Sequence, residues 1–132
     1  GTDASLPYLE AGNVRIYTGD FFALRAADVA DCGAVYDRAA LIALPPEMRA
    51  RYATHLRALF GRVLPTLLIT IDYDQERVAG PPFSVPLAEV ERLFASHVRI
   101  EHLAADPSPQ VPPKLAEAGP VAEHVVALRL RR

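Results

Sequence analysis

The sequence predicts an α/β fold, in which helices cover the faces of a β-sheet. Apolar, β-favouring runs alternate with helical patterns along the chain. Residues 66–73 form a nearly continuous apolar run, which is typical of a strand that is covered on both faces. Prolines at positions 46 and 86 stand where two amphipathic helices begin. A length of 132 residues indicates one domain.

The first third of the chain predicts two strands and a short helix. Val14–Tyr17 favours a strand, and Gly19-Asp20 ends it. Residues 25–31 predict a helical turn, and the apolar residues 32–37 predict a second strand. Residues 1–5 are expected to form a loop.

Two longer helices follow, each started by proline. The first begins at Pro45-Pro46 and is expected to end at Gly61, because glycine tolerates the left-handed conformation that often follows a helix. Its predicted buried face consists of Met48, Tyr52, Leu56, Leu59 and Phe60, whereas Arg49, Arg51, His55 and Arg57 are predicted to lie mostly off that face. The second begins at Pro86, and its predicted buried face consists of Leu87, Val90, Leu93 and Phe94.

The carboxyl-terminal part predicts two strands joined by a proline-rich segment. Residues 97–103 and 122–130 alternate between apolar and polar, which indicates an antiparallel pair at the edge of the sheet. Residues 106–120 contain five prolines and are expected to form a linker or surface loop rather than part of the core.

Composition excludes several classes of protein. The net charge of −2 and the lack of a basic stripe argue against a nucleic-acid partner, and the basic cluster at 129–132 is read as a solvated strand end. No apolar run is long enough to span a membrane. The single cysteine, Cys32, fits a reducing, cytoplasmic location. The four histidines do not cluster in the sequence, so no metal site is expected.

Polar residues follow three of the predicted strands. Ligands of open α/β sheets bind beyond the carboxyl ends of strands, so Asp20, Asp37-Arg38 and residues 72–74 are candidates for one cleft. Two alternatives remain open. Asp20 can cap a short helix while Phe21 joins the core, and Arg38 can form a structural ion pair with Asp37 or with the aspartate at position 72.

Four long strings in the sequence resemble the thiopurine S-methyltransferase family, and its bacterial branch in particular. They are IYTGDFFAL, VYDRAALIALPPEMRARYATHL, LLITIDYDQ and GPPFSVPLAEVERLF. The resemblance runs in order from Tyr8 to Phe94 and continues weakly through the last two strands. It implies a class I S-adenosylmethionine-dependent, Rossmann-like sheet in the order 3-2-1-4-5-7-6, with the last strand reversed.

The resemblance also implies a function and a set of site residues. It implies S-adenosyl-L-methionine as the methyl donor and, as the acceptor, a thiol or thione sulfur, as in thiopurines, or a selenium or tellurium compound. Asp20 and Phe21 match the contacts with the adenine, and Arg38 matches a residue beside cofactor and acceptor that is expected to act in catalysis. Tyr73 and the loop at residues 80–85, which contains Pro82 and Phe83, are expected to border the acceptor.

The resemblance covers only part of the family's domain. Residues 1–132 match strands three to seven, so the first two strands and the glycine-containing loop are absent from these residues. We therefore expect a carboxyl-terminal portion of a longer methyltransferase, inactive alone, or a homo-oligomer. Direct pairing of residues 14–17 with residues 32–37 is another way to close the gap. The competing hypotheses are a degenerate, non-catalytic module that binds a partner, and an unrelated small α/β enzyme.

Overall fold

The computed structural model describes residues 6–61 and 64–130. The expected loop at residues 1–5 and the last two residues of the basic cluster lie outside the described residues. The strands are β1 (Tyr8–Ala11), β2 (Val14–Tyr17), β3 (Val35–Arg38), β4 (Thr66–Asp72), β5 (Val98–Asp106) and β6 (Ala122–Leu130). The α-helices are α1 (Pro46–Phe60) and α2 (Leu87–Phe94), and the 3-10 turns are η1 (Phe21–Ala23), η2 (Ala26–Val29), η3 (Leu41–Ala43) and η4 (Pro113–Leu115).

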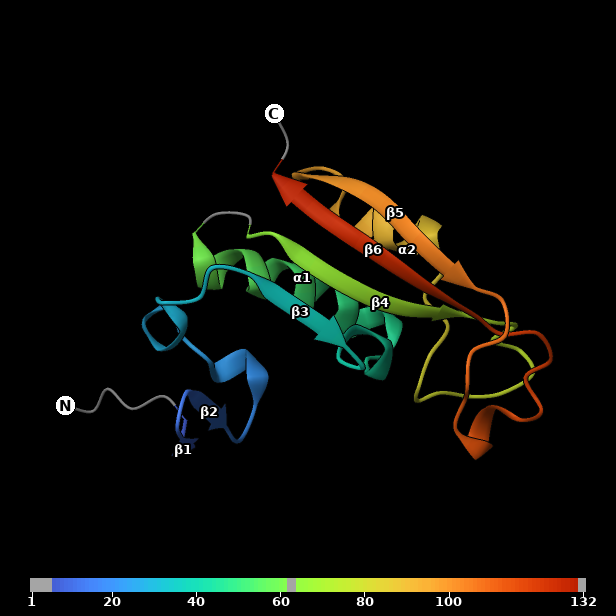
Figure 1. The fold of residues 1–132 in the computed structure, drawn as a ribbon, viewed down its shortest axis with the longest axis horizontal. Coiled ribbons are helices and arrows are strands. Elements are labelled where there is room, and N and C mark those ends of the chain that lie inside the picture. The colour runs from blue at the N-terminus through green and yellow to red at the C-terminus, as the bar shows by residue number, and fades with distance from the viewer. Residues whose placement is uncertain (1–5, 62–63, 131–132) are drawn as a thin grey trace.

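The main sheet has the strand order β3-β4-β6-β5 (Figure 1). β3 runs parallel to β4, and β6 runs antiparallel to both of its neighbours. This is the 4-5-7-6 half of the expected class I sheet, with the reversed strand in its place. The predicted antiparallel pair is confirmed, but β6 lies between β4 and β5 rather than at the edge.

The strand predicted at Val14–Tyr17 is present, but it pairs with Tyr8–Ala11 in a separate antiparallel hairpin. Gly12, with φ of 56°, makes the turn between the two strands, a conformation that glycine adopts without a steric penalty. Within the described residues this hairpin forms no strand pairing with the main sheet, so direct pairing of β2 with β3 does not occur.

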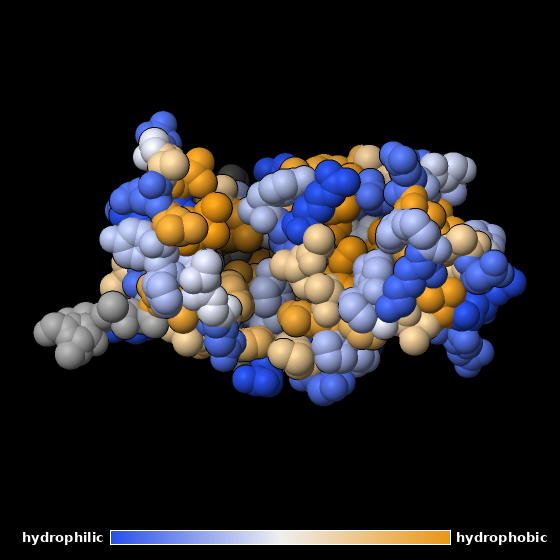
Figure 2. Space-filling view, turned by 90° about the horizontal axis from the view of Figure 1, so that it is seen from below, coloured by the Kyte–Doolittle hydropathy of each residue, from blue (hydrophilic) through white to orange (hydrophobic). Residues whose placement is uncertain are grey.

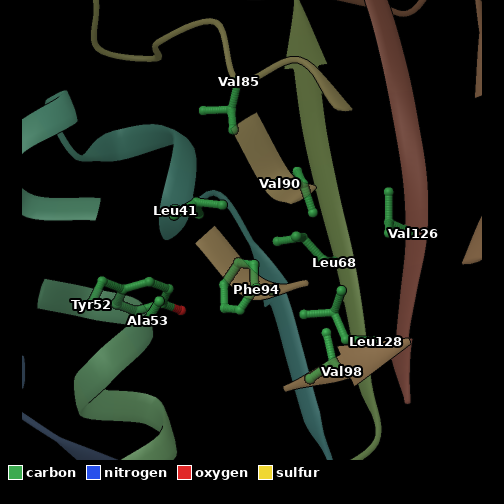
Figure 3. Packing of buried hydrophobic residues seen from close by; sticks show 10 residues of the cluster. All are labelled: Leu41, Tyr52, Ala53, Leu68, Val85, Val90, Phe94, Val98, Val126 and Leu128. Carbon is green, nitrogen blue, oxygen red and sulfur yellow. The ribbon is translucent and has the colours of Figure 1, made fainter. Parts of the chain in front are cut away.

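Both α-helices lie on one face of the main sheet, behind it in Figure 1. The helix predicted from Pro46 is confirmed, and Gly61 ends it with φ of 60°. The second helix is also confirmed, with Val90 and Phe94 buried. The core between helices and sheet contains Leu41, Tyr52, Ala53, Leu68, Val85, Val90, Phe94, Val98, Val126 and Leu128 (Figure 3).

The opposite face of the sheet is covered only in part. Leu67 is 39% exposed and Tyr36 is 63% exposed, although both lie on strands. The prediction that the run at residues 66–73 is covered on both faces is therefore wrong for the first part of β4, around Leu67. In Figure 2, which views the molecule from the side of β3 and the hairpin, apolar side chains reach the surface in several places.

The proline-rich segment covers the carboxyl end of this second face. Leu115 is 1% exposed and Ala118 is fully buried, and both pack with Ile71 and Tyr73 in a second apolar cluster. The prediction that residues 106–120 contribute nothing to the core is wrong. The prolines shape the segment, but its few apolar side chains anchor it to the sheet.

Candidate functional site

Arg38 and Asp37 end β3 and point to opposite faces of the sheet, because successive side chains alternate along a strand. Arg38 is exposed and forms no ion pair with residues 6–61 or 64–130, so neither predicted structural pair is present. It lines a hollow of about 150 Å³ whose wall includes Pro82. The guanidinium is therefore available to a ligand at the carboxyl end of β3.

Asp37 is buried on the helix side, where it holds two elements together. Its Oδ2 accepts a 2.5 Å hydrogen bond from the Tyr52 hydroxyl of α1. Its Oδ1 accepts a 3.3 Å hydrogen bond from the backbone N–H of Leu41, in η3. Burial, and then the Asp37 charge, raise the pKa of Tyr52 well above its usual value. Asp37 therefore has a structural role, and its neighbour Arg38 carries the exposed charge.

Tyr73 fixes the segment that carries Pro82. The Tyr73 hydroxyl donates a 2.7 Å hydrogen bond to the Pro82 carbonyl, and its backbone N–H donates to Ser84 Oγ at 3.0 Å. Tyr73 is buried and is not among the residues that line the hollow at Arg38. Of these two predicted acceptor residues, Pro82 borders the hollow and Tyr73 holds Pro82 in place.

Phe83 packs against Arg49 of α1 and not against the hollow at Arg38. Its backbone N–H donates a 2.6 Å hydrogen bond to the Ile42 carbonyl. Its ring lies 5.5 Å from the guanidinium carbon of Arg49, and Phe83 is not among the residues that line the hollow. A Cβ at position 80 would collide with this ring, so Gly80 is needed for the close approach.

Arg49 was predicted to lie off the buried face of its helix, and this is wrong. It is 4% exposed and forms a 3.0 Å ion pair with Glu89 of α2, which is 6% exposed. Its Nε also donates to the Leu44 carbonyl at 2.9 Å. Burial lowers the pKa of Arg49. Apolar periodicity cannot reveal a buried charge whose partner lies 40 residues away, on another helix.

Asp20 and Phe21 lie at η1, away from Arg38. Asp20 Oδ1 accepts a 2.9 Å hydrogen bond from the backbone N–H of Phe22, so the predicted cap is present. Phe21 packs against Tyr52 and His55, with ring centroids 5.3 and 5.1 Å apart. Neither residue lines the hollow at Arg38.

The cap leaves room for a ligand contact at Asp20. This residue is exposed, and its second carboxylate oxygen forms no hydrogen bond with the described residues, so it fits an exocyclic amine such as that of adenine. The described residues thus hold one candidate contact for a nucleoside at η1 and one for an acceptor at β3, in separate places.

Two histidines meet although the sequence separates them by 22 positions. His124 Nδ1 and His102 Nε2 lie 3.1 Å apart, and His124 Nε2 lies 3.6 Å from Asp72 Oδ2. The expectation that the histidines do not cluster is wrong for this pair. In the described residues these side chains do not form a group that could hold a metal ion.

Comparison with known proteins agrees with the topology of the sheet. The model of the thiopurine S-methyltransferase family matches residues 3–130. The chain belongs to this family. The hypothesis of an unrelated small α/β enzyme is therefore wrong.

Similar proteins include three bacterial enzymes named thiopurine S-methyltransferase. The one from Pseudomonas fluorescens (strain Pf0-1) is 56% identical over 96 residues, which are 70% of this chain and 42% of the relative. The one from Azotobacter vinelandii is 55% identical over 71% of this chain and 43% of the relative. The one from Pseudomonas aeruginosa (strain PAO1) is 58% identical over 73% of this chain and 44% of the relative. The chain therefore spans less than half the length of these relatives.

A solved structure also has a fold similar to that of this chain. The crystal structure of an S-adenosylmethionine-dependent methyltransferase from Anabaena variabilis matches with a TM-score of 0.51 and 20% sequence identity. The match covers 80% of this chain and 53% of the other chain. The chain has the class I methyltransferase fold. Among the residues that the structure describes, no helix is long and apolar enough to cross a membrane.

Proposed function

We propose that these residues form the acceptor side of an S-adenosylmethionine-dependent S-methyltransferase. Its acceptor is a thiol or thione sulfur, as in thiopurines, or a selenium or tellurium compound, and its location is the cytoplasm. The proposal is supported above all by the unpaired Arg38 guanidinium, which stands at the carboxyl end of β3 beside a hollow bordered by Pro82. Strand ends of this kind are where α/β sheets bind ligands.

Arg38 is suited to hold the acceptor as an anion. A sulfur nucleophile reacts faster as a thiolate than as a thiol, and a nearby cation favours the anionic form. The methyl donor, when bound, supplies an electrophilic methyl group on a sulfonium. The enzyme then needs to align the acceptor with that group and to exclude water, so no strong general base is required.

Asp20 and Phe21 are the residues of this chain that we assign to the adenine of the donor. Asp20 offers a carboxylate oxygen that no described residue uses, and Phe21, the next residue, is an aromatic side chain that packs against Tyr52. These two positions do not share the Arg38 hollow, and we propose that most of the donor site comes from residues other than these 132. We expect the 132 residues alone to bind S-adenosylmethionine weakly and to be inactive.

Substitution of Arg38 tests the proposal in the protein at its natural length. Arg38→Ala should lower kcat/KM for thiol acceptors at least tenfold, and Arg38→Lys should recover part of the loss by keeping the charge without the planar guanidinium. Arg99→Ala serves as a control, because Arg99 is also an exposed arginine on a strand of the same sheet. Unchanged kinetics in both Arg38 variants would remove Arg38 from the mechanism.

A non-catalytic module that forms oligomers is the second candidate. The observation that favours it is the exposed apolar face around Tyr36 and Leu67, which another polypeptide can cover. The two candidates differ in measurable ways. A methyltransferase binds S-adenosylmethionine at its natural length and turns over a thiol, whereas the module elutes as an oligomer in size-exclusion chromatography with light scattering and shows neither property.

A further inference from the structure

The hollow beside Arg38 has an apolar floor and two charged residues. The floor comes from Ile69 and Ile71 of β4, and the walls come from Pro82 and from the proline-rich residues 109–112. The charged side chains that line it are Arg38 and Glu123. Glu123 is the second residue of β6 and is not among the site residues predicted from the sequence.

The strand register places these two charges on the same face, on either side of β4. Arg38 is paired with Ile69, and Glu123 is paired with Ile71. Side chains two residues apart on a strand share a face, so the two isoleucines lie between the charges. Two strand spacings of about 4.8 Å and an offset of two residues along the strands separate Arg38 from Glu123, which sets their α-carbons roughly 12 Å apart.

Neither charge is neutralised by the protein. Like Arg38, the Glu123 side chain forms no ion pair and no hydrogen bond with another side chain of residues 6–61 or 64–130. Glu123 is half-buried. A half-buried carboxylate without a protein partner is suited to receive a hydrogen bond from a ligand. The apolar volume of about 150 Å³ between the charges is a size that admits an aromatic ring.

We propose that Glu123 determines acceptor specificity by accepting an N–H from the ring edge that points away from Arg38. This inference rests on the proposed function and assigns to Glu123 the discrimination between acceptors. The site selects a flat heteroaromatic thiol or thione that carries a ring N–H, over an aryl thiol of the same size without one. Ile69 and Ile71 contact the ring face, and the two charges fix its orientation.

The test compares two bicyclic acceptors: 5-mercaptoindole, whose ring N–H lies on the ring away from the thiol, and 2-naphthalenethiol, which has no ring N–H. In the protein at its natural length, Glu123→Gln should raise KM for 5-mercaptoindole about tenfold, because the hydrogen bond loses its charged partner. The KM for 2-naphthalenethiol should stay within twofold, and kcat should change little for both. Glu117→Gln is the matched control, because Glu117 is exposed and lies outside the hollow.

The outcomes show whether Glu123 binds the ring N–H of the acceptor or has only a structural role. Equal changes in KM for the two acceptors, or no change for either, would overturn the role of Glu123 while leaving the proposed function intact. If the unmutated protein methylates neither acceptor nor any other thiol, the proposed function fails and the inference fails with it. If Glu123→Gln does not fold, Glu123→Asp keeps the charge but shortens its reach, and it should show the same selective rise in KM.

Discussion

The Tyr52 hydroxyl donates a 2.5 Å hydrogen bond to Oδ2 of Asp37, and this contact joins α1 to the end of β3. Asp37 is 3% exposed and Tyr52 is 6% exposed. Side chains alternate along β3, so Asp37 faces this contact and Arg38 lies on the opposite face. The contact fixes the end of β3 that carries Arg38 to α1.

Removal of the Tyr52 hydroxyl should destabilise the fold. Tyr52→Phe keeps the ring but leaves the buried Asp37 carboxylate with only the Leu41 N–H as a partner. We expect a loss of about 1–3 kcal/mol in the free energy of unfolding, measured by urea denaturation. Tyr36→Phe is the matched control, because Tyr36 is largely exposed, and its stability should be unchanged.

Alkaline pH should weaken the folded state through the same tyrosine. Burial raises the pKa of Tyr52 in the folded state above the ordinary tyrosine value of about 10. A raised pKa means that the folded state keeps its proton while the unfolded state loses it, so stability falls as pH rises past about 10. Between pH 9 and pH 11 the unmutated protein should lose more stability than Tyr52→Phe, and equal slopes would contradict this account.

The buried ion pair between Arg49 and Glu89 should be sensitive to removal of one partner. Arg49→Ala leaves the Glu89 carboxylate in the interior with Arg92 as its remaining ionic partner, and we expect a loss of about 3–5 kcal/mol in unfolding free energy. The double variant Arg49→Met/Glu89→Leu removes both charges and should lose less than Arg49→Ala. A larger loss in the double variant would show that the pair itself, rather than the unpaired charge, sets the energy.

Much of the fold could be predicted from the sequence because its signals are local. Proline before α1 and glycine after it mark the helix ends by backbone geometry alone, and β4 stands out as a long apolar run. The covering of the sheet could not be predicted in this way. It depends on which segments pack against each face of the sheet. Leu115 covers part of the second face, although the five prolines of its segment predict a surface loop.

The candidate site was predicted in part for the same reason. Arg38 follows a recognisable strand, so its place at a strand end is a local property. Glu123 is the second residue of β6, 85 positions later, and lines the hollow because β6 runs beside β4. Such a contact is set by strand order and register, and the spacing of residues in the sequence does not carry that information.

Leu115 should anchor the proline-rich segment over the hollow. Leu115→Ala removes a side chain that is 1% exposed, and a cavity of that size costs about 2–5 kcal/mol. Amide hydrogen exchange at residues 109–121 should accelerate more than exchange in β4. Lys114→Ala, a change at the exposed neighbour, should leave both the stability and the exchange rates unchanged. Exchange that stays slow in Leu115→Ala would show that the segment is held by other contacts.

The exposed apolar face makes a final prediction about the protein at its natural length. Leu67 lies 39% exposed beside Tyr36 and a hollow of about 450 Å³ lined by Leu103 and Ala127. If further polypeptide covers this face, Leu67→Ser should lower the unfolding free energy of the natural-length protein by about 1–3 kcal/mol, because covered apolar surface is lost. The same change in the 132-residue chain should cost much less and should reduce self-association in light scattering. Equal costs in both forms would mean that the face stays open to solvent, and the sheet would then end at β3 in the working protein as well.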